Sequence, residues 1–200
     1  MKKAQLILGL SLIIVFSSCK KGIDGIINSV TGASKAIGQY VKYTIPQGEQ
    51  YSDNSTYAST SYSEQKFIVK FDSSAIYTTK ETSNQSDVNK LYGFSDNNAQ
   101  HHEFSARIGW RWRDNELHLF SYVYNNSVVA ISDLGKVEIG TENTCSIKVS
   151  GNAYIFTVNG NTQSVPRAST TATAAGYKLY PYFGGNEMAP HTITISIKEL

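Results

Sequence analysis

The chain has 200 residues and a net charge of +2 at pH 7; 40% of its residues are hydrophobic, 12% aromatic and 17% charged. This length and apolar content suffice for one folded domain with a substantial core. No Lys/Arg-rich run occurs outside the first residues, so the basic footprint of a nucleic-acid-binding protein is missing and we exclude that class.

The N-terminus has the layout of a signal peptide. Met1-Lys2-Lys3 is basic, residues 6–16 form an apolar run too short for a permanent membrane-spanning helix, and Ser17-Ser18-Cys19 follows. Small residues directly before a cysteine resemble the lipobox of Bacteroidetes-type lipoproteins, in which the cysteine carries lipid. The resemblance implies a signal peptide over residues 1–18 and lipidation at Cys19. It also implies a location in the cell envelope, anchored to the outer membrane on its periplasmic or surface face.

The segment after this leader is rich in Gly, Ser and small side chains. We interpret residues 19–42 as a lipid anchor and tether, and residues 43–200 as the folded domain. With Cys19 modified, Cys145 is the one remaining thiol, so the mature chain makes no intramolecular disulfide. Cys145 lies in the alternating segment TCSIKV, which predicts a buried small hydrophobic residue rather than a nucleophile.

From residue 43 onward, short segments alternate apolar and polar residues between turn residues. This period of two predicts strands, and the 13 Tyr and 8 Phe residues favour them too. The expected strands span residues 66–71, 75–80, 90–95, 104–113, 117–125, 128–132, 136–140, 144–150, 154–159, 162–166, 177–184 and 192–200. The turn pairs are Asp114-Asn115, Asn125-Asn126 and Asn159-Gly160. With no helical segment between the strands, we expect an all-β fold of two antiparallel sheets packed face to face.

The segment FSARIGWRWR, residues 104–113, has two different faces. The apolar face carries Phe104, Ala106, Ile108, Trp110 and Trp112, and the polar face carries Arg107, Arg111 and Arg113. We expect both tryptophans to pack in the core. The three arginines repel one another unless they pair with anions, either carboxylates of this domain or an acidic glycan. Alternatively, their stems cover neighbouring side chains while the charged groups stay in water.

The next expected strand supplies His118, with Tyr122 and Tyr124 on the same face. Tyr and Arg side chains together on an open sheet suit a saccharide, through stacking and bidentate hydrogen bonds. The candidate ligand-binding residues are therefore Arg107, Arg111, Arg113, His118, Tyr122 and Tyr124.

Three stretches resemble a family of secreted and lipid-anchored Bacteroidetes proteins with a concanavalin A-like (laminin G-like) jelly roll. They are NKLYGFSDNNAQHHEFSARIGWRW, YIFTVNG and YKLYPYFGGNEMAPHTITISI. The resemblance covers about residues 43–200 and implies a concanavalin A-like jelly roll. That fold hosts lectins, glycan-binding modules, glycoside hydrolases and polysaccharide lyases, so it does not choose between binding and catalysis.

The pattern of carboxylates argues against a retaining glycosidase. Such an enzyme needs two carboxylates about 5 Å apart, and the strand pattern Glu-x-Asp-x-x-Glu or a near variant is absent. The acidic residues that stand singly at turns or strand ends are Glu103, Asp114, Glu116, Glu138 and Glu142.

A polysaccharide lyase is the alternative catalytic hypothesis. The segment YPYFGG is similar to the Tyr-Phe-Lys-Ala-Gly strand of alginate lyases. The residue types of a jelly-roll lyase are present as His101, His102, Arg107, His118, Tyr180 and Tyr182. However, the Lys of that strand, a Gln-Ile-His strand and the Glu of an Arg-Glu-x-Arg stretch are missing. Each departure removes a residue that the mechanism needs.

His101-His102 follow Asp96, Asn97 and Asn98, which raises the question of a metal site. Neither the oxygen-rich loop nor the histidine pair has a diagnostic ligand spacing. We interpret the segment as a polar hairpin loop whose Asp and Asn side chains bind local backbone groups. We expect no metal and no cofactor.

These observations favour binding over catalysis. The leading hypothesis is a lipid-anchored envelope protein that binds a carbohydrate, as polysaccharide or oligosaccharide, or another ligand without acting on it. A divergent lyase for uronate-containing glycans and a protein-interaction domain without a small ligand remain the alternatives. The expected contacts are a glycan and, through Cys19, the membrane, with no nucleic acid.

Overall fold

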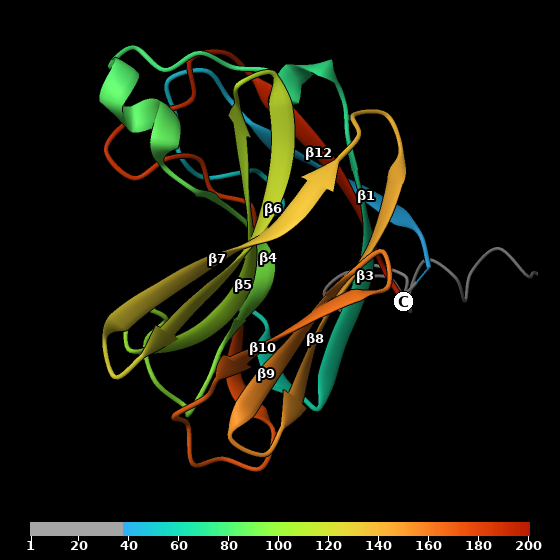
Figure 1. Ribbon diagram of the computed structural model, residues 1–200, viewed down its shortest axis with the longest axis vertical. Helices are drawn as coiled ribbons and strands as arrows, with labels where there is room; N and C mark the ends of the chain where they lie inside the picture. Colours follow the sequence, from blue (N-terminus) through green and yellow to red (C-terminus); the bar gives the residue numbers. More distant parts are fainter. Residues whose placement is uncertain (1–37) are drawn as a thin grey trace, which may run out of the picture. The chain divides into compact units, whose positions relative to one another are not determined.

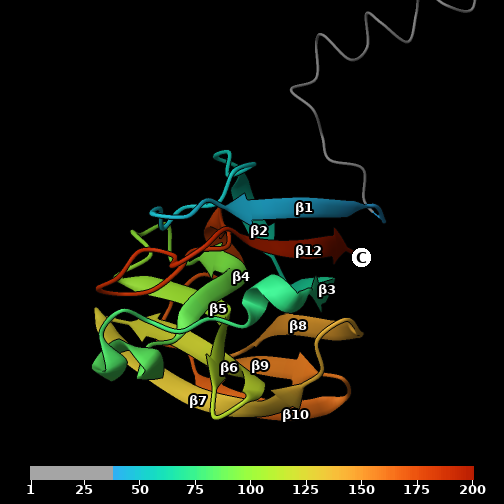
Figure 2. The same cartoon turned by 90° about the horizontal axis from the view of Figure 1, so that it is seen from above.

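Two six-stranded antiparallel sheets pack face to face (Figures 1 and 2), as the alternating sequence predicts. The computed structural model describes residues 38–200. The predicted signal peptide, Cys19 and most of the predicted tether lie outside the described residues. Among residues 38–200, no helix has the length and apolar character needed to cross a bilayer.

The first sheet holds, in spatial order, β1 (Tyr40–Ile45), β12 (Ile193–Glu199), β3 (Glu64–Phe71), β8 (Glu142–Ser150), β9 (Ala153–Val158) and β10 (Asn161–Pro166). The second holds β2 (Ser59–Tyr62), β11 (Ala174–Leu179), β4 (Asn89–Ser95), β5 (Phe104–Arg113), β6 (Glu116–Asn125) and β7 (Val128–Val137). Two short 3-10 helices, η1 (Ser73–Ala75) and η2 (Thr82–Ser86), connect β3 to β4. Sequence neighbours such as β4, β5, β6 and β7 pair directly, whereas β12 enters between β1 and β3.

The core forms from the apolar faces of both sheets, and the predicted apolar face of β5 belongs to it. Trp110 is fully buried and packs against Phe71, Tyr77 and Phe183, with ring centroids 5.5, 5.6 and 6.3 Å away. Trp112 is half-buried at the edge of this core. The prediction that both tryptophans face inward is confirmed.

Cys145 is also fully buried, as its alternating segment predicts. Burial raises the pKa of its thiol to about 12. A thiol with that pKa stays protonated at neutral pH and is a poor nucleophile.

Two-residue turns set the register of three hairpins. Asp114-Asn115 joins β5 to β6 and Asn159-Gly160 joins β9 to β10, and both central residues of each turn have positive φ. This is the geometry of type I′ turns, which Asn, Asp and Gly favour. Between β6 and β7 the turn residues are Asn126-Ser127, one position later than predicted, because Asn125 pairs with Val128.

The strand predicted at residues 75–80 is wrong. Ala75, Tyr77 and Thr79 are buried alternately, but their backbone joins no ladder, and the Thr79 amide donates to the Gln85 side chain. The alternation therefore reflects a loop that inserts side chains into one end of the core. Here burial has a period of two without sheet hydrogen bonds.

Further differences concern where strands begin and end, as with β11, which spans Ala174–Leu179 instead of the predicted residues 177–184. The strands predicted at residues 128–132 and 136–140 form one strand, β7, bent by a bulge where Gly135 has a φ of 111°. The short edge strand β2 lies in a polar stretch where no strand is predicted. Strand β1 begins at Tyr40, inside the segment interpreted as tether, and its sequence YVKYTI does alternate.

Candidate functional site

The pairing of β5 with β6 places the six candidate ligand-binding residues on one face of the second sheet. Arg107 lies opposite Tyr122, Arg111 opposite His118, and Ser105 opposite Tyr124. Directly opposed residues of antiparallel strands share a face. The apolar residues of β5 occupy the other face, so this polar face points away from the core.

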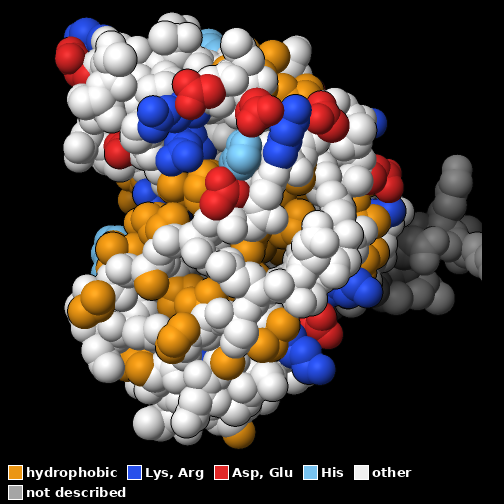
Figure 3. Space-filling view, in the orientation of Figure 1, with side chains coloured by type: hydrophobic (Ala, Val, Ile, Leu, Met, Phe, Trp, Pro, Cys, Tyr) orange, Lys and Arg blue, Asp and Glu red, His pale blue; other side chains and the backbone are white. Residues whose placement is uncertain are grey.

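A cleft of about 630 Å³ opens on this face. Figure 3 shows a hollow at the left margin of the molecule, with basic and hydrophobic side chains around it. The cleft is lined by Tyr51, Ser55, Lys90, His101, His102, Arg107, Tyr122, Tyr124, Lys178, Leu179, Tyr180, Pro181, Tyr182, Gly185 and Asn186. Among the described residues no Asp or Glu lines the cleft, so its charged side chains are all basic or imidazole groups.

Arg107 is the most unusual residue of the cleft. Its side chain is 6% exposed, and its guanidinium carbon lies 5.1 Å from the centre of the Tyr122 ring. Its buried Nε has no hydrogen-bond partner, and no carboxylate in residues 38–200 forms an ion pair with it. Burial lowers the pKa of the guanidinium, while the phenol groups around it, Tyr122 first, act in the opposite direction. A buried cation without a counter-ion is costly, so the site favours an anion.

Lys90 of β4 stands beside Arg107. Its Nζ donates to the Gly184 carbonyl at 2.8 Å and lies 5.0 Å from the Tyr122 ring and 5.7 Å from the Tyr182 ring. Burial and then the charge of Arg107 lower the pKa of Lys90 to about 8. At neutral pH Arg107 and Lys90 therefore place two positive charges next to the rings of Tyr122 and Tyr182.

Two histidines of the β4–β5 loop form the neighbouring wall. The rings of His101 and His102 are 4.2 Å apart, His101 Nδ1 lies 2.9 Å from the Tyr177 hydroxyl, and His102 packs on Tyr124. Burial, then the charges of Arg107 and His102, lower the pKa of His101 to about 4. His101 is therefore neutral at physiological pH and offers the cleft hydrogen bonds rather than charge.

The other three candidates lie at the opposite end of the face, around a smaller hollow of about 280 Å³. Arg113 pairs with Asp114 at 3.2 Å, and His118 lies between Glu116 at 3.2 Å and Asp133 at 2.9 Å. We call this group the ion-paired end.

Arg111 reaches the same end without a carboxylate contact. Its Nη1 donates to the Ser86 carbonyl at 3.1 Å, and its guanidinium lies 4.7 Å from the Phe120 ring. Carboxylates of the domain thus satisfy Arg113 and His118, and a backbone carbonyl satisfies Arg111. Arg107 has neither kind of partner among residues 38–200.

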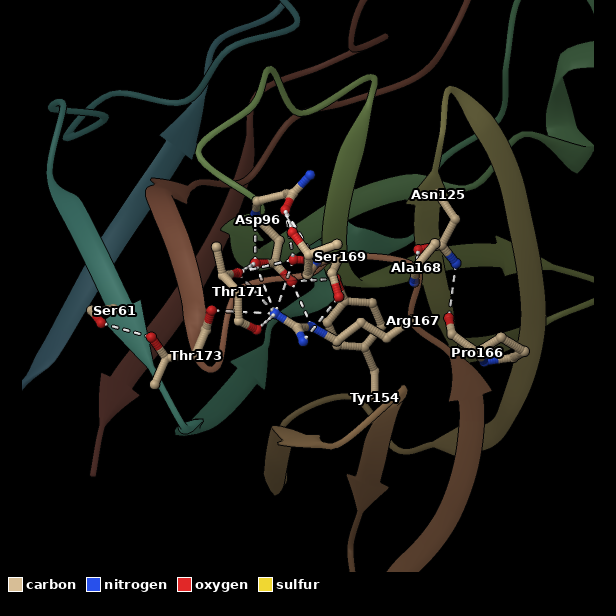
Figure 4. A network of polar contacts seen from close by, with 12 residues as sticks. Ser61, Asp96, Asn125, Tyr154, Pro166, Arg167, Ala168, Ser169, Thr171 and Thr173 are labelled. Atoms are coloured by element: carbon tan, nitrogen blue, oxygen red, sulfur yellow. Dashed lines mark hydrogen bonds and ion pairs between the residues drawn. The ribbon is translucent and has the colours of Figure 1, made fainter.

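Asp96 accepts from the Asn97 backbone amide at 2.6 Å, as its loop sequence predicts, but it also has partners far away in the chain. It is fully buried, and both of its oxygens accept from Arg167, at 2.8 and 3.2 Å, while Tyr154 donates at 2.6 Å (Figure 4). Burial would raise the pKa of this carboxyl, but the hydrogen bonds from Arg167 and Tyr154 hold it below its usual value. Asp96 is therefore a structural ion-pair partner and not a neighbour of His101 in a metal site.

The loop after β10 encloses the charged group of Arg167. The guanidinium also donates to the Thr171 and Thr173 carbonyls, at 2.7 and 3.2 Å, and to the Ser169 hydroxyl at 3.0 Å. Since Asp96 begins the loop that carries His101 and His102, the network fixes one wall of the cleft to the rest of the sandwich.

Several cleft residues are absent from the six candidates. Two of them are Lys90 and Lys178, which nothing nearby along the chain marks as cleft residues. His101, His102, Tyr180 and Tyr182 match lyase residue types, but only the pairing of strands shows that they share a cleft with Arg107.

No protein-family model matches the chain, and no curated protein matches its sequence. Among solved structures, the alginate lyase AlyC3 is similar over 80% of this chain and 74% of its own, with 9% identity and a TM-score of 0.55. An alginate lyase from Pseudomonas aeruginosa is similar over 80% and 81%, with 10% identity and a TM-score of 0.50. A GH16 protein from Bacteroides ovatus is similar over 84% of both chains, with 12% identity and a TM-score of 0.50. At these identities the comparisons show the fold, a jelly-roll β-sandwich.

Proposed function

We propose that the cleft binds an acidic polysaccharide, with Arg107 pairing with a uronate carboxylate. The observation that carries this proposal is the buried guanidinium of Arg107, which has a free Nε and no carboxylate partner in the described residues. Its planar group matches a carboxylate in a bidentate geometry. AlyC3 has a structure in complex with dimannuronate, and its similarity to this chain supports the choice of ligand class.

The remaining cleft residues suit the sugar rings and the other charges of such a polymer. Tyr122, Tyr124 and Tyr182 offer aromatic faces, and Lys90 supplies a second positive charge. Aromatic rings bind the apolar faces of sugars, while cations attract the polymer and set its register. Neither stacking on the sugar rings nor attraction of the charged polymer requires a catalytic group.

The test compares two forms of one polymer by isothermal titration calorimetry. The purified protein is titrated with oligouronate and with the same oligosaccharide after its carboxylates have been reduced to alcohols. We expect the acidic form to bind at least tenfold more tightly, and Arg107→Met to remove that difference. Lys70→Met, on an exposed position of β3 in the other sheet, is the matched control. If Arg113→Met abolishes binding and Arg107→Met does not, the ligand uses the ion-paired end and the proposal is wrong.

Lyase activity is the second candidate, and the environment of Lys90 favours it. With a pKa of about 8, Lys90 is partly neutral near physiological pH and is able to accept a proton. It lies beside Tyr182, a potential proton donor, and beside Arg107, which would neutralise the carboxylate next to the acidic carbon–hydrogen bond. Absorbance of unsaturated uronate, followed during the titration, distinguishes lyase activity from binding without catalysis. Rising absorbance that Lys90→Met abolishes would make the protein an enzyme.

We also propose that the chain is tethered to the envelope through lipid on Cys19. The order of basic, apolar and small residues before that cysteine supports this proposal. Cys19→Ala should move the protein from the membrane fraction to the soluble fraction of the cells that produce it. Retention of the variant in the membrane fraction would contradict lipid anchoring.

A further inference from the structure

A short apolar strip, Val129 and Ile131 in the first half of β7, lies next to two residues that line the cleft, Tyr122 and Tyr124. Ile131 lies opposite Tyr122, and Val129 opposite Tyr124, so both side chains share the face of the sheet that carries the cleft. They are 46% and 43% exposed. Hydrophobic side chains gather over the lower left of Figure 3, where this half of β7 lies in Figure 1.

The strip continues a row that begins at Arg107. Across the sheet, Arg107 faces Tyr122, which in turn faces Ile131. Neighbouring strands are about 4.8 Å apart, so the row passes from a cation to an aromatic ring to an aliphatic side chain within roughly 10 Å. An acidic sugar chain without substituents offers the aliphatic end only the C–H groups of its ring faces and no methyl group.

The edge position of β7 makes this exposure unusual. It is the last strand of its sheet in the described residues, and no charged side chain or proline occurs between Val128 and Ser132. Edge strands usually carry such residues because they discourage unwanted pairing. Exposed aliphatic residues in this place therefore indicate a surface that is covered by a ligand.

We infer that the cleft takes an acidic glycan bearing small acyl esters, such as O-acetyl groups, with the acyl methyl groups against Val129 and Ile131. The inference rests on the proposed function, because it needs the carboxylate of the same glycan at Arg107. Tyr122 and Tyr124 then contact the sugar rings that join the acidic group to the ester. The strip thus selects the substitution pattern of the polymer, whereas Arg107 selects its acidity.

The experiment uses one uronate polymer in two forms, untreated and chemically O-acetylated, and measures the affinity of the purified protein for each. We expect acetylation to tighten binding about fourfold for every methyl group that the strip buries. Val129→Thr and Ile131→Thr keep a branched side chain suited to strands but place a hydroxyl on the strip. Both should reduce the preference for the acetylated form towards one while leaving the affinity for the untreated polymer unchanged.

Val128→Thr is the matched control, because Val128 is 69% exposed on the opposite face of the same strand. It should leave the preference intact. Equal affinity of the wild type for both forms, or an equal effect of Val128→Thr, would overturn the inference while the proposed function stands. Failure to bind either form would overturn both. Self-association that Ile131→Thr abolishes, with no preference for acetylation, would assign the strip to a second copy of the chain and contradict the inference.

Discussion

Gly93 lies directly opposite Arg107 in the pairing of β4 with β5, and the absence of its side chain leaves the space that the arginine occupies. A Cβ at position 93 would come within 2.8 Å of the Arg107 Cγ, 2.6 Å of its Cα and 2.1 Å of the Ala106 carbonyl oxygen. Gly93 therefore lets the strands approach closely and lets the guanidinium lie over the sheet towards Tyr122.

Gly93→Ala should disturb both the sheet and the cleft. The added methyl meets backbone atoms that are unable to move away freely, so we expect a loss of about 1–3 kcal/mol in the free energy of unfolding. Because Arg107 is displaced as well, affinity for acidic glycan should fall. Urea denaturation and calorimetry on one preparation measure the two effects. Wild-type affinity in a destabilised variant would show that the position of Arg107 is irrelevant to binding.

Arg107→Met should not destabilise the free protein. The substitution keeps a long side chain beside Tyr122 and removes a buried charge that no carboxylate of the described residues offsets. Replacing a buried charge by an apolar side chain is often neutral or stabilising. We expect an unchanged or higher Tm, by about 2–4 °C for each kcal/mol gained. A fall of several degrees would mean that Arg107 serves the fold and not a ligand.

Binding should weaken as the pH rises through the pKa of Lys90. That pKa is about 8, against roughly 10.4 for an unperturbed lysine, so the cleft loses one positive charge between pH 7 and pH 9. We expect about a three- to tenfold loss of affinity for oligouronate over this interval. Lys90→Arg should flatten the profile, since arginine stays charged. An equally steep profile in that variant would assign the pH dependence to another group.

The same shift acts on stability with the opposite sign. The folded protein releases the Lys90 proton more readily than the unfolded chain does, so the unfolded state binds more protons between about pH 8 and 10. In that window Lys90 makes stability rise with pH. A Lys90→Met variant should lack this contribution, which urea denaturation at pH 7 and pH 9.5 measures.

Asp96→Asn should destabilise the protein strongly at neutral pH. The substitution leaves Arg167 buried without its carboxylate, and we expect a loss of about 3 kcal/mol. The pKa of Asp96 is lowered in the folded state, so its contribution is present above the unfolded value, near pH 4. It is lost as the pH falls through the lower folded value. The difference between wild type and variant should therefore shrink in strong acid, and a constant difference would refute the ion-pair explanation.

Local patterns in the sequence predict the architecture well. Alternation along residues 104–113 places Trp110 in the core and Arg107 on the open face, and Asn159-Gly160 predicts its hairpin turn. Such signals act between near neighbours in the chain, so one sequence is enough to read them. The residues at 75–80 mislead because a loop that inserts side chains into a core end imitates the period of a strand.

The partners of charged groups depend on contacts between distant segments, and the sequence does not predict them. Arg113 pairs with Asp114, its neighbour in the chain, but the residue that makes room for Arg107 is Gly93 on another strand. The sequence predicts that Asp96 binds local backbone groups, and it does accept from the Asn97 amide, but its counter-ion is Arg167, 71 positions later. The candidate cleft therefore emerges from strand order and register rather than from any single motif.

The most direct test of the account is the affinity of wild type and Arg107→Met for oligouronate and for its carboxyl-reduced form. The account predicts at least tenfold tighter binding of the acidic form by the wild type, and equal, weak binding of both forms by a variant that remains folded. Equal affinity of the wild type for the two forms, or undiminished discrimination by Arg107→Met, would contradict it.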